Sequence, residues 1–196
     1  MLKRRFATVL LIVGACSAAG AATPHSASDP AAKAEQPVAA EKNPPGDIPD
    51  NQAFVEYRSP LGFSIKVPEG WARRENPGDV SFSDKYNRAQ VALSSQPSSP
   101  TVASLKADQF AALQKSPHAI RVVSVMQVAL PAGTVSVVHY GSNSDVNPVT
   151  NKAIRLDNTS YYFWKAGRLA TLTVSAPAGA DNADQWQLMA RSFAWR

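Results

Sequence analysis

Aromatic side chains are confined almost entirely to one part of this 196-residue chain. All four Trp, all five Tyr and six of the seven Phe lie beyond position 53. Aromatic residues bury large apolar areas and dominate the energetics of protein cores. The 144 residues from 53 to 196 can therefore build one core of ordinary domain size. We expect a single folded domain over 53–196, preceded by an appendage without a core of its own.

Short segments with alternating apolar and polar residues follow one another through this domain. In the segment 63–67, Phe63, Ile65 and Val67 alternate with polar residues, which is the pattern of a half-buried strand. The turn at 165–167 joins two long strand-like arms and predicts a hairpin. Strands are predicted at 54–57, 63–67, 80–83, 89–94, 120–130, 134–140, 152–164 and 168–175.

Two segments show helical spacing instead. Thr101 is placed to cap a helix that runs to about Lys115, before Pro117. Near the end of the chain, Asp181 and Asp184 resemble a capping box that opens a second helix. Strands, one helix, more strands and a closing helix indicate the α+β class. The hairpins favour a mostly antiparallel sheet, flanked by the two helices.

Several short motifs follow one another along the domain. They are Tyr57–Trp71, Val80–Asp84, Tyr161–Phe163, Gly167–Leu169, Thr171–Ser175, Trp186 and Ser192-Phe193. Their order and spacing resemble those of the Mog1/PsbP-like domains, over essentially all of 54–195. The resemblance implies an α/β/α sandwich and no catalytic residues. PsbP is an extrinsic subunit of photosystem II and Mog1 binds a small GTPase, so the resemblance implies action through a surface.

The first fifteen residues have the features of a bacterial lipoprotein signal peptide. Three basic residues at 3–5 precede a short apolar stretch at 6–13, which is too short to span a bilayer. The sequence Val13-Gly14-Ala15-Cys16 then resembles a lipobox. In that family the thiol is acylated and cleavage frees the amine of the same Cys, so Cys16 is the predicted lipidation site.

An ordinary secretory signal with an incidental Cys is the alternative, with cleavage near Ala22. The lipobox is favoured because the only Cys of the chain falls at the end of the apolar stretch, after two small residues. Two or three acyl chains anchor a protein stably. We expect a protein held at the extracytoplasmic face of the cell membrane, or at the outer membrane in a Gram-negative cell.

Between the signal and the domain, residues 16–52 comprise the lipidated Cys and an Ala- and Pro-rich linker. The linker contains no aromatic residue, and its larger aliphatic residues are Val38 and Ile48. Such a segment buries too little apolar surface to offset the entropy of ordering. We expect a disordered spacer between the membrane and the domain.

The charge of the chain does not indicate a nucleic-acid partner. Residues 17–52 carry a net charge of −3, and residues 53–196 carry +5. No basic cluster stands out in the sequence, and an exported protein rarely meets nucleic acid. The basic balance of the domain is therefore a modest property of its surface.

The sequence offers no recognisable catalytic or metal-binding constellation. The three His, at 25, 118 and 139, are far apart and show no zinc-ligand spacing. There is no nucleophile elbow, phosphate loop or dinucleotide fingerprint. We predict a protein that is not an enzyme and needs no metal or cofactor.

Two of the four Trp are the candidate binding surface. Trp71 follows a turn and Trp186 has helical core spacing, so both are expected in the core. Trp164 lies beside a hairpin turn and Trp195 lies near the chain end. If Trp164 and Trp195 were exposed near each other, they would form a contact patch.

The leading hypothesis is a non-enzymatic lipoprotein that acts as a protein-binding or assembly module at the cell envelope, with an envelope protein as its partner. The alternative is a carrier of a small apolar ligand or glycolipid. A large apolar pocket lined by Trp and Tyr would favour the carrier.

Overall fold

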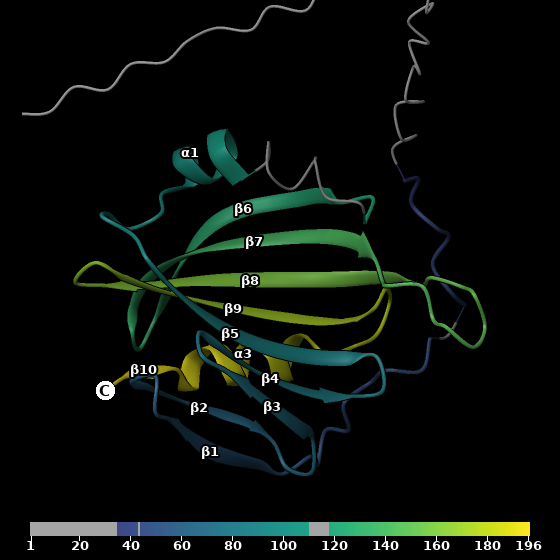
Figure 1. Cartoon of the computed structure of the whole chain (residues 1–196), viewed down its shortest axis with the longest axis horizontal. Helices are drawn as coiled ribbons and strands as arrows, with labels where there is room; N and C mark the ends of the chain where they lie inside the picture. Colours follow the sequence, from purple (N-terminus) through teal and green to yellow (C-terminus); the bar gives the residue numbers. More distant parts are fainter. Residues whose placement is uncertain (1–34, 43, 110–117) are drawn as a thin grey trace, which may run out of the picture. The chain divides into compact units, whose positions relative to one another are not determined.

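The chain forms two antiparallel sheets in a computed structural model that describes residues 35–42, 44–109 and 118–196 (Figure 1). Every neighbouring pair of strands is antiparallel. The smaller sheet has the order β1 (Phe54–Ser59), β2 (Phe63–Pro68), β10 (Ala194–Trp195). The larger sheet has the order β3 (Ala72–Asn76), β4 (Asp79–Asp84), β5 (Asn87–Ser95), β9 (Arg168–Pro177), β8 (Arg155–Lys165), β7 (Gly133–Asn143), β6 (Arg121–Leu130).

The strands form where the sequence alternates. In β9, Leu172 and Val174 are fully buried, whereas Thr171 and Thr173, which alternate with them, are only half-buried. The β8–β9 hairpin closes over Ala166-Gly167, and both residues have positive φ, 48° and 82°. Two consecutive positive φ values are typical of the tight turns that join antiparallel strands. The predicted hairpin at 165–167 is therefore confirmed. Strands β3 and β10 were not predicted.

One face of the seven-stranded sheet carries the main core. Helix α3 (Ala183–Ser192) and the three-stranded sheet cover this face, and α3 runs behind β4 and β5 in Figure 1. Phe193 stands at the centre of this core, with ring centroids 4.1 Å from Phe163 and 5.6 Å from Phe63. Trp71 and Trp186 pack against the same core and are partly buried.

The described residues cover the opposite face of the seven-stranded sheet much less. Helix α1 (Val102–Ser104) and the π-helical turn η1 (Leu105–Gln109) place Leu105 over a small cluster with Val138, Tyr162 and Leu169. The two clusters use alternate residues of one strand, because Phe163 belongs to the main core and Tyr162 belongs to this smaller cluster. The sheet therefore has one apolar face and one face that is apolar only under η1.

The helices differ from the sequence-based expectation. Thr101 caps α1 as predicted, since its Oγ1 accepts a hydrogen bond from the Ser104 amide at 3.1 Å. The rest of the predicted helix at 110–115 lies outside the described residues. The N-cap of α3 is Asn182, not Asp181, and its side chain makes no capping bond because it binds elsewhere. The described fold is mainly β, and a helix-flanked α/β/α sandwich overstates its helical content.

Residues 35–52 correct the prediction of a linker that is disordered up to the domain. We call residues 35–52, apart from 43, the strap. The Asn143 side chain forms one clamp: Nδ2 donates to Glu35 and to the Gln36 carbonyl, and Oδ1 accepts from the Val38 amide. At the second clamp, Asn182 Oδ1 accepts from the Ile48 amide at 2.6 Å, and Asn182 Nδ2 donates to the Gly46 carbonyl.

The strap has too few apolar residues to fold by itself, and side chains of the domain hold it in place through these hydrogen bonds. Ile48, one of its few aliphatic residues, is 4% exposed. Asn143 and Asn182 are 3% and 1% exposed, so their hydrogen bonds form away from water. The compact unit extends from residue 34 to 196 rather than from 53. Among the described residues, no helix is both long and apolar enough to cross a membrane.

Candidate functional site

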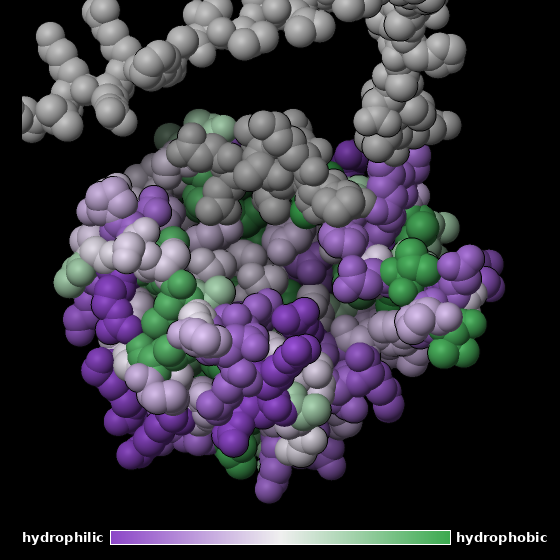
Figure 2. Space-filling view, in the orientation of Figure 1, coloured by the Kyte–Doolittle hydropathy of each residue, from purple (hydrophilic) through white to green (hydrophobic). Residues whose placement is uncertain are grey.

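The open part of the seven-stranded sheet contains a hollow of about 610 Å³. We call it the polar hollow. Figure 2 shows this side of the molecule, which is recessed near its middle and has hydrophilic side chains below the recess. The floor of the polar hollow is formed by Ser81, Ser83, Gln90, Asn158, Thr173 and Ser175, and its rim includes Arg74, Lys85, Tyr86, Arg88 and the loop 143–148.

Strand register places these side chains on one face. Arg74 on β3 lies opposite Ser81 on β4, and Ser81 lies opposite Gln90 on β5. Arg88 lies between Ser83 and Ser175 on the two neighbouring strands. Because side chains alternate along a strand, the buried core residues occupy the positions between them. The same alternation that buries the core therefore lines the hollow with polar groups.

Part of the floor is already hydrogen-bonded within the protein. Gln90 Nε2 donates to Asp79 Oδ1 at 3.1 Å, and Asn158 Nδ2 donates to Ser142 Oγ at 3.0 Å. The hydroxyls of Ser160 and Thr173 are 2.9 Å apart and share one hydrogen bond. These bonds fix the side chains in position, so the floor is rigid before any ligand arrives.

Three hydroxyl groups of the floor are not engaged in this way. Within the described part of the chain, Ser81, Ser83 and Ser175 form no side-chain hydrogen bond, and their hydroxyl oxygens are not sealed from water. A hydroxyl both donates and accepts. These three groups are therefore available to a ligand seated in the hollow.

The rim adds positive charge that the protein does not neutralise. Arg74, Lys85 and Arg88 are exposed, and none of them forms an ion pair with another described residue. The adjacent Arg73 points to the other face of β3. Its Nε lies 3.2 Å from Glu75 Oε1, and its guanidinium lies over the Tyr57 ring. Arg73 and Arg74 therefore lie on opposite faces of the sheet, and only Arg73 forms an ion pair with another described residue.

The loop on the far side of the hollow carries the acidic residue of its lining, Asp145. His118 Nε2 lies 3.6 Å from Asp145 Oδ1. No three His, Cys, Asp or Glu residues gather into a metal-binding group within the described ranges. His139 Nδ1 lies 2.8 Å from Thr159 Oγ1, and burial lowers the pKa of His139. Neither His139 nor Thr159 lines the polar hollow.

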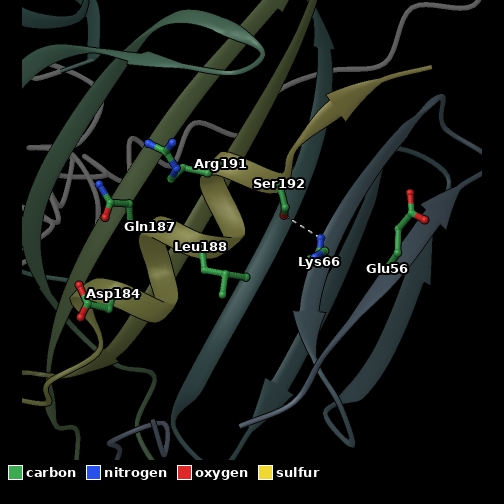
Figure 3. Close-up of a pocket in the computed structure, with 7 residues that line it drawn as sticks. All are labelled: Glu56, Lys66, Asp184, Gln187, Leu188, Arg191 and Ser192. Carbon is green, nitrogen blue, oxygen red and sulfur yellow. Dashed lines mark hydrogen bonds between the residues drawn. The ribbon is translucent and has the colours of Figure 1, made fainter. Parts of the chain in front are cut away.

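A second groove, of about 520 Å³, runs between α3 and the three-stranded sheet (Figure 3). Leu188 lies in its middle and is 39% exposed, while Asp184, Arg191, Lys66 and Glu56 surround it (Figure 3). Ser192 Oγ accepts a hydrogen bond from the Lys66 amide at 2.8 Å across the groove. Its charges are of both signs, and Glu56 already pairs with Arg58 and Arg196. The two positive and two negative side chains that line the groove sum to zero, whereas the charges that line the polar hollow do not.

A third hollow, of about 410 Å³, is more apolar. Its lining includes Val55, Tyr57, Val67, Trp71 and Phe82, between the two sheets. Arg73 and Glu56 stand at the same hollow. This is the place in the described structure where a Trp and a Tyr line a common cavity together with aliphatic groups.

The predicted patch of Trp164 and Trp195 does not form. Trp164 packs with the smaller cluster under η1, and its Nε1 donates to the Gln96 carbonyl at 2.8 Å. Trp195 packs against the main core, on the other face of the sheet, with the Arg168 guanidinium 4.9 Å from its ring. Both rings are half-buried and lie on opposite faces of the sheet. Cys16, the predicted lipidation site, lies outside the described residues.

The polar hollow was not predicted from the sequence because its floor residues are scattered over four strands. Each strand contributes one or two ordinary Ser, Thr, Asn or Gln residues, and only the register brings them together. The available signal was the polar half of each alternating strand. An amphipathic strand predicts a solvated face, and a hollow on that face depends on the strands and loops around it.

Comparison with known proteins supports the fold assignment. No family model matches the sequence, and no curated protein matches it either. The solution structure of cyanobacterial PsbP (CyanoP) from Synechocystis sp. PCC 6803 is similar with a TM-score of 0.55 at 14% identity, covering 74% of this chain and 94% of that one. The Ran-binding protein Mog1p of Saccharomyces cerevisiae gives 0.49 at 13% identity, covering 74% and 96%.

Identities this low show the fold alone. The domain is Mog1/PsbP-like, as the order of its sequence motifs predicted.

Proposed function

We propose that this protein is a lipid-anchored, non-enzymatic module that binds another protein at the extracytoplasmic face of a bacterial membrane. The polar hollow is the observation that carries the binding role. Among the described residues, it is an open part of the sheet face, with a hydrogen-bonded floor, three hydroxyls without a side-chain partner and three cations without an ion pair. Surfaces that bind proteins specifically combine fixed polar groups with charge that a partner can complement.

The anchor of this proposal is the lipobox Cys at position 16. The strap is held against the domain from residue 35, so 18 residues separate Cys16 from the first clamp. A chain of 18 residues spans at most about 65 Å when fully extended. The reach from the membrane is therefore about half of that available to a linker that runs free to residue 52.

The absence of a catalytic role is part of the proposal. Among the described residues of the polar hollow, the titratable groups sit on the rim, where His118 lies beside Asp145, and the floor is neutral. The His139–Thr159 pair lies in a strand interior and lines none of the hollows described above. A binding role requires only the groups that the hollow already presents.

The anchor is tested by metabolic labelling with an alkyne fatty acid, followed by membrane fractionation. We expect the intact protein to carry the label and to sediment with membranes, and Cys16→Ser to lose both properties. Label and membrane association that survive in Cys16→Ser would contradict the anchor.

The binding surface is tested by photo-crosslinking in intact cells. Benzoylphenylalanine replaces Tyr86, which is 41% exposed at the rim of the polar hollow, or Leu188, which is 39% exposed in the α3 groove. We expect a discrete protein adduct from position 86 and none from position 188. Adducts from position 188 alone would move the binding surface to the α3 groove, and no adduct from either position would contradict a protein partner.

The hollow lined by Trp71 and Tyr57 favours a second candidate, a carrier of a small apolar ligand. The test uses an environment-sensitive naphthalene dye with the purified protein. A carrier predicts saturable dye fluorescence that Trp71→Ala abolishes and Trp164→Ala leaves unchanged. Equal losses in the two variants would assign the dye binding to general loosening of the core.

A further inference from the structure

The charge on the rim of the polar hollow specifies the chemistry of the partner. Arg74, Lys85 and Arg88 are exposed on the β3–β5 side of the hollow and form no ion pair with described residues. Asp79 on β4 accepts hydrogen bonds from the neutral amides of Asn76 and Gln90 and does not line the hollow. Arg74, Lys85 and Arg88 outnumber Asp145 among the lining residues, so the hollow presents a net positive charge beside neutral hydrogen-bonding groups.

The spacing of the cations suits a ligand with more than one negative group. Arg74 lies on β3 and Arg88 lies on β5, with β4 between them. Their register positions, opposite Ser81 and Ser83, differ by two residues along β4. Strand spacing and rise then place the two Cα atoms roughly 12 Å apart. At this separation each guanidinium group can pair with a carboxylate of its own, and the hydroxyls of the floor remain open to the rest of the ligand.

An extended polypeptide fits this arrangement. Its alternate side chains repeat at about 6.8 Å on one side, so two carboxylates of an acidic segment reach both guanidinium groups. Arginine pairs with carboxylates in a planar, two-bond geometry. The free hydroxyls of Ser81, Ser83 and Ser175 lie between the cations and farther along the floor, where a peptide backbone can donate to them and accept from them.

The lining argues against an acidic glycan. Saccharides stack on aromatic rings, and among the lining residues the aromatic group is Tyr86, on the rim. The aromatic rings of the same sheet face, Tyr162 and Trp164, pack in the cluster beneath Leu105 instead. The floor offers hydrogen bonds and no stacking platform.

We propose that the polar hollow binds an acidic, extended segment of the partner protein, with Arg74 and Arg88 pairing with its carboxylates and Lys85 supporting them. This inference rests on the proposed protein-binding function and names the partner's chemistry. Arg73 provides a matched control, because it neighbours Arg74 on β3 but faces the other side and pairs with Glu75.

The test measures fluorescence anisotropy with the intact lipoprotein in non-ionic detergent. The probes are a labelled octapeptide of alternating Glu and Ser, its Gln and Ser counterpart, and an oligogalacturonate of equal charge. We expect the Glu peptide to bind and the Gln peptide to bind at least tenfold more weakly. We expect Arg74→Gln with Arg88→Gln to weaken binding of the Glu peptide about tenfold or more, and Arg73→Gln to change it less than twofold.

Several results would overturn the inference. Equal losses in the Arg73 and Arg74/Arg88 variants would show non-specific attraction, and equal binding of the Glu and Gln peptides would remove the role of charge. Tighter binding of the oligogalacturonate would assign the hollow to an acidic glycan. If the adduct from position 86 forms in cells but persists undiminished in the double variant, the acidic segment is wrong and the protein-binding function stands. If no adduct forms, the function itself fails.

Discussion

The two faces of the seven-stranded sheet share one backbone and differ in the burial and polarity of their side chains. On β9, Leu172 and Val174 are 0% exposed beneath α3 and the three-stranded sheet. On the other side of the same strand, Thr173 and Ser175 line an open hollow. Burial of apolar area supplies most of the folding free energy. The covered face therefore holds the fold, and the open face is free to carry polar groups that a binding site needs.

The groups that stabilise the fold and the groups available for binding therefore lie on different faces of the sheet. The core side is sealed by stacked rings around Phe193. The open side relies on Leu105 for its only apolar cover among the described residues, and beyond that cluster its floor is neutral and polar. Changes on the two sides should therefore affect different measurements, and variants of neighbouring residues on one strand can separate them.

The largest expected effect comes from the covered face. Phe163→Ala removes a ring that stacks 4.1 Å from Phe193 and is 1% exposed. Loss of the buried ring leaves a cavity, so we expect the free energy of unfolding to fall by about 3–5 kcal/mol. Thr171→Ala, on the open side of the paired strand, should change it by less than about 0.5 kcal/mol. Urea denaturation measures both, and similar losses would show that the open face also holds the fold.

A smaller effect is expected at the second clamp of the strap. Asn182→Ala removes the acceptor of the Ile48 amide and the donor to the Gly46 carbonyl, and Asn87 loses its contact as well. We expect a loss of about 2–3 kcal/mol, because buried polar groups are left without partners.

The exposed Asn76 provides the control for this clamp. Asn76→Ala removes an exposed hydrogen bond to Asp79 and should cost less than about 0.5 kcal/mol. Amide hydrogen exchange over residues 44–50 should accelerate in Asn182→Ala only. Unchanged protection there would mean that the strap is held by other contacts.

The smallest effect concerns pH. Burial lowers the pKa of His139 below its usual 6.5, so the unfolded chain takes up a proton at a higher pH than the folded protein does. The contribution of neutral His139 to the free energy of unfolding is therefore fully present above pH 6.5, and it is lost as the pH falls from there. We expect the free energy of unfolding to decline as the pH falls below 6.5, and His139→Gln to flatten that decline. An identical pH dependence in the variant would exclude His139 as its source.

Much of this fold follows from local sequence patterns. The alternation of apolar and polar residues predicted most strands, and the turn at 165–167 predicted the longest hairpin. The order of the motifs predicted the Mog1/PsbP-like domain. Strand β3 escaped prediction because Ala72–Asn76 is exposed throughout and has no apolar alternation. Strand β10 has two residues and exists through its pairing with β2.

The candidate site depends on information that no local pattern contains. The strap is ordered by Asn143 and Asn182, which lie more than 100 residues away in the sequence. The predicted Trp164–Trp195 patch failed because position along the chain does not reveal which face of a sheet receives each ring. The floor of the polar hollow likewise arises from the register of four strands. The sequence shows which polar and aromatic side chains each strand carries. It does not show which of them come together in the folded domain.

The central claim is that the open face contacts a partner in the membrane and the α3 groove does not. Single cysteines at Ser83, in the polar hollow, and at Gln187, in the groove, test it by maleimide labelling in native membranes and in the purified protein. We predict that Ser83→Cys reacts several-fold more slowly in membranes than after purification, and that Gln187→Cys reacts at the same rate in both. Equal rates for Ser83→Cys in the two preparations would contradict the account.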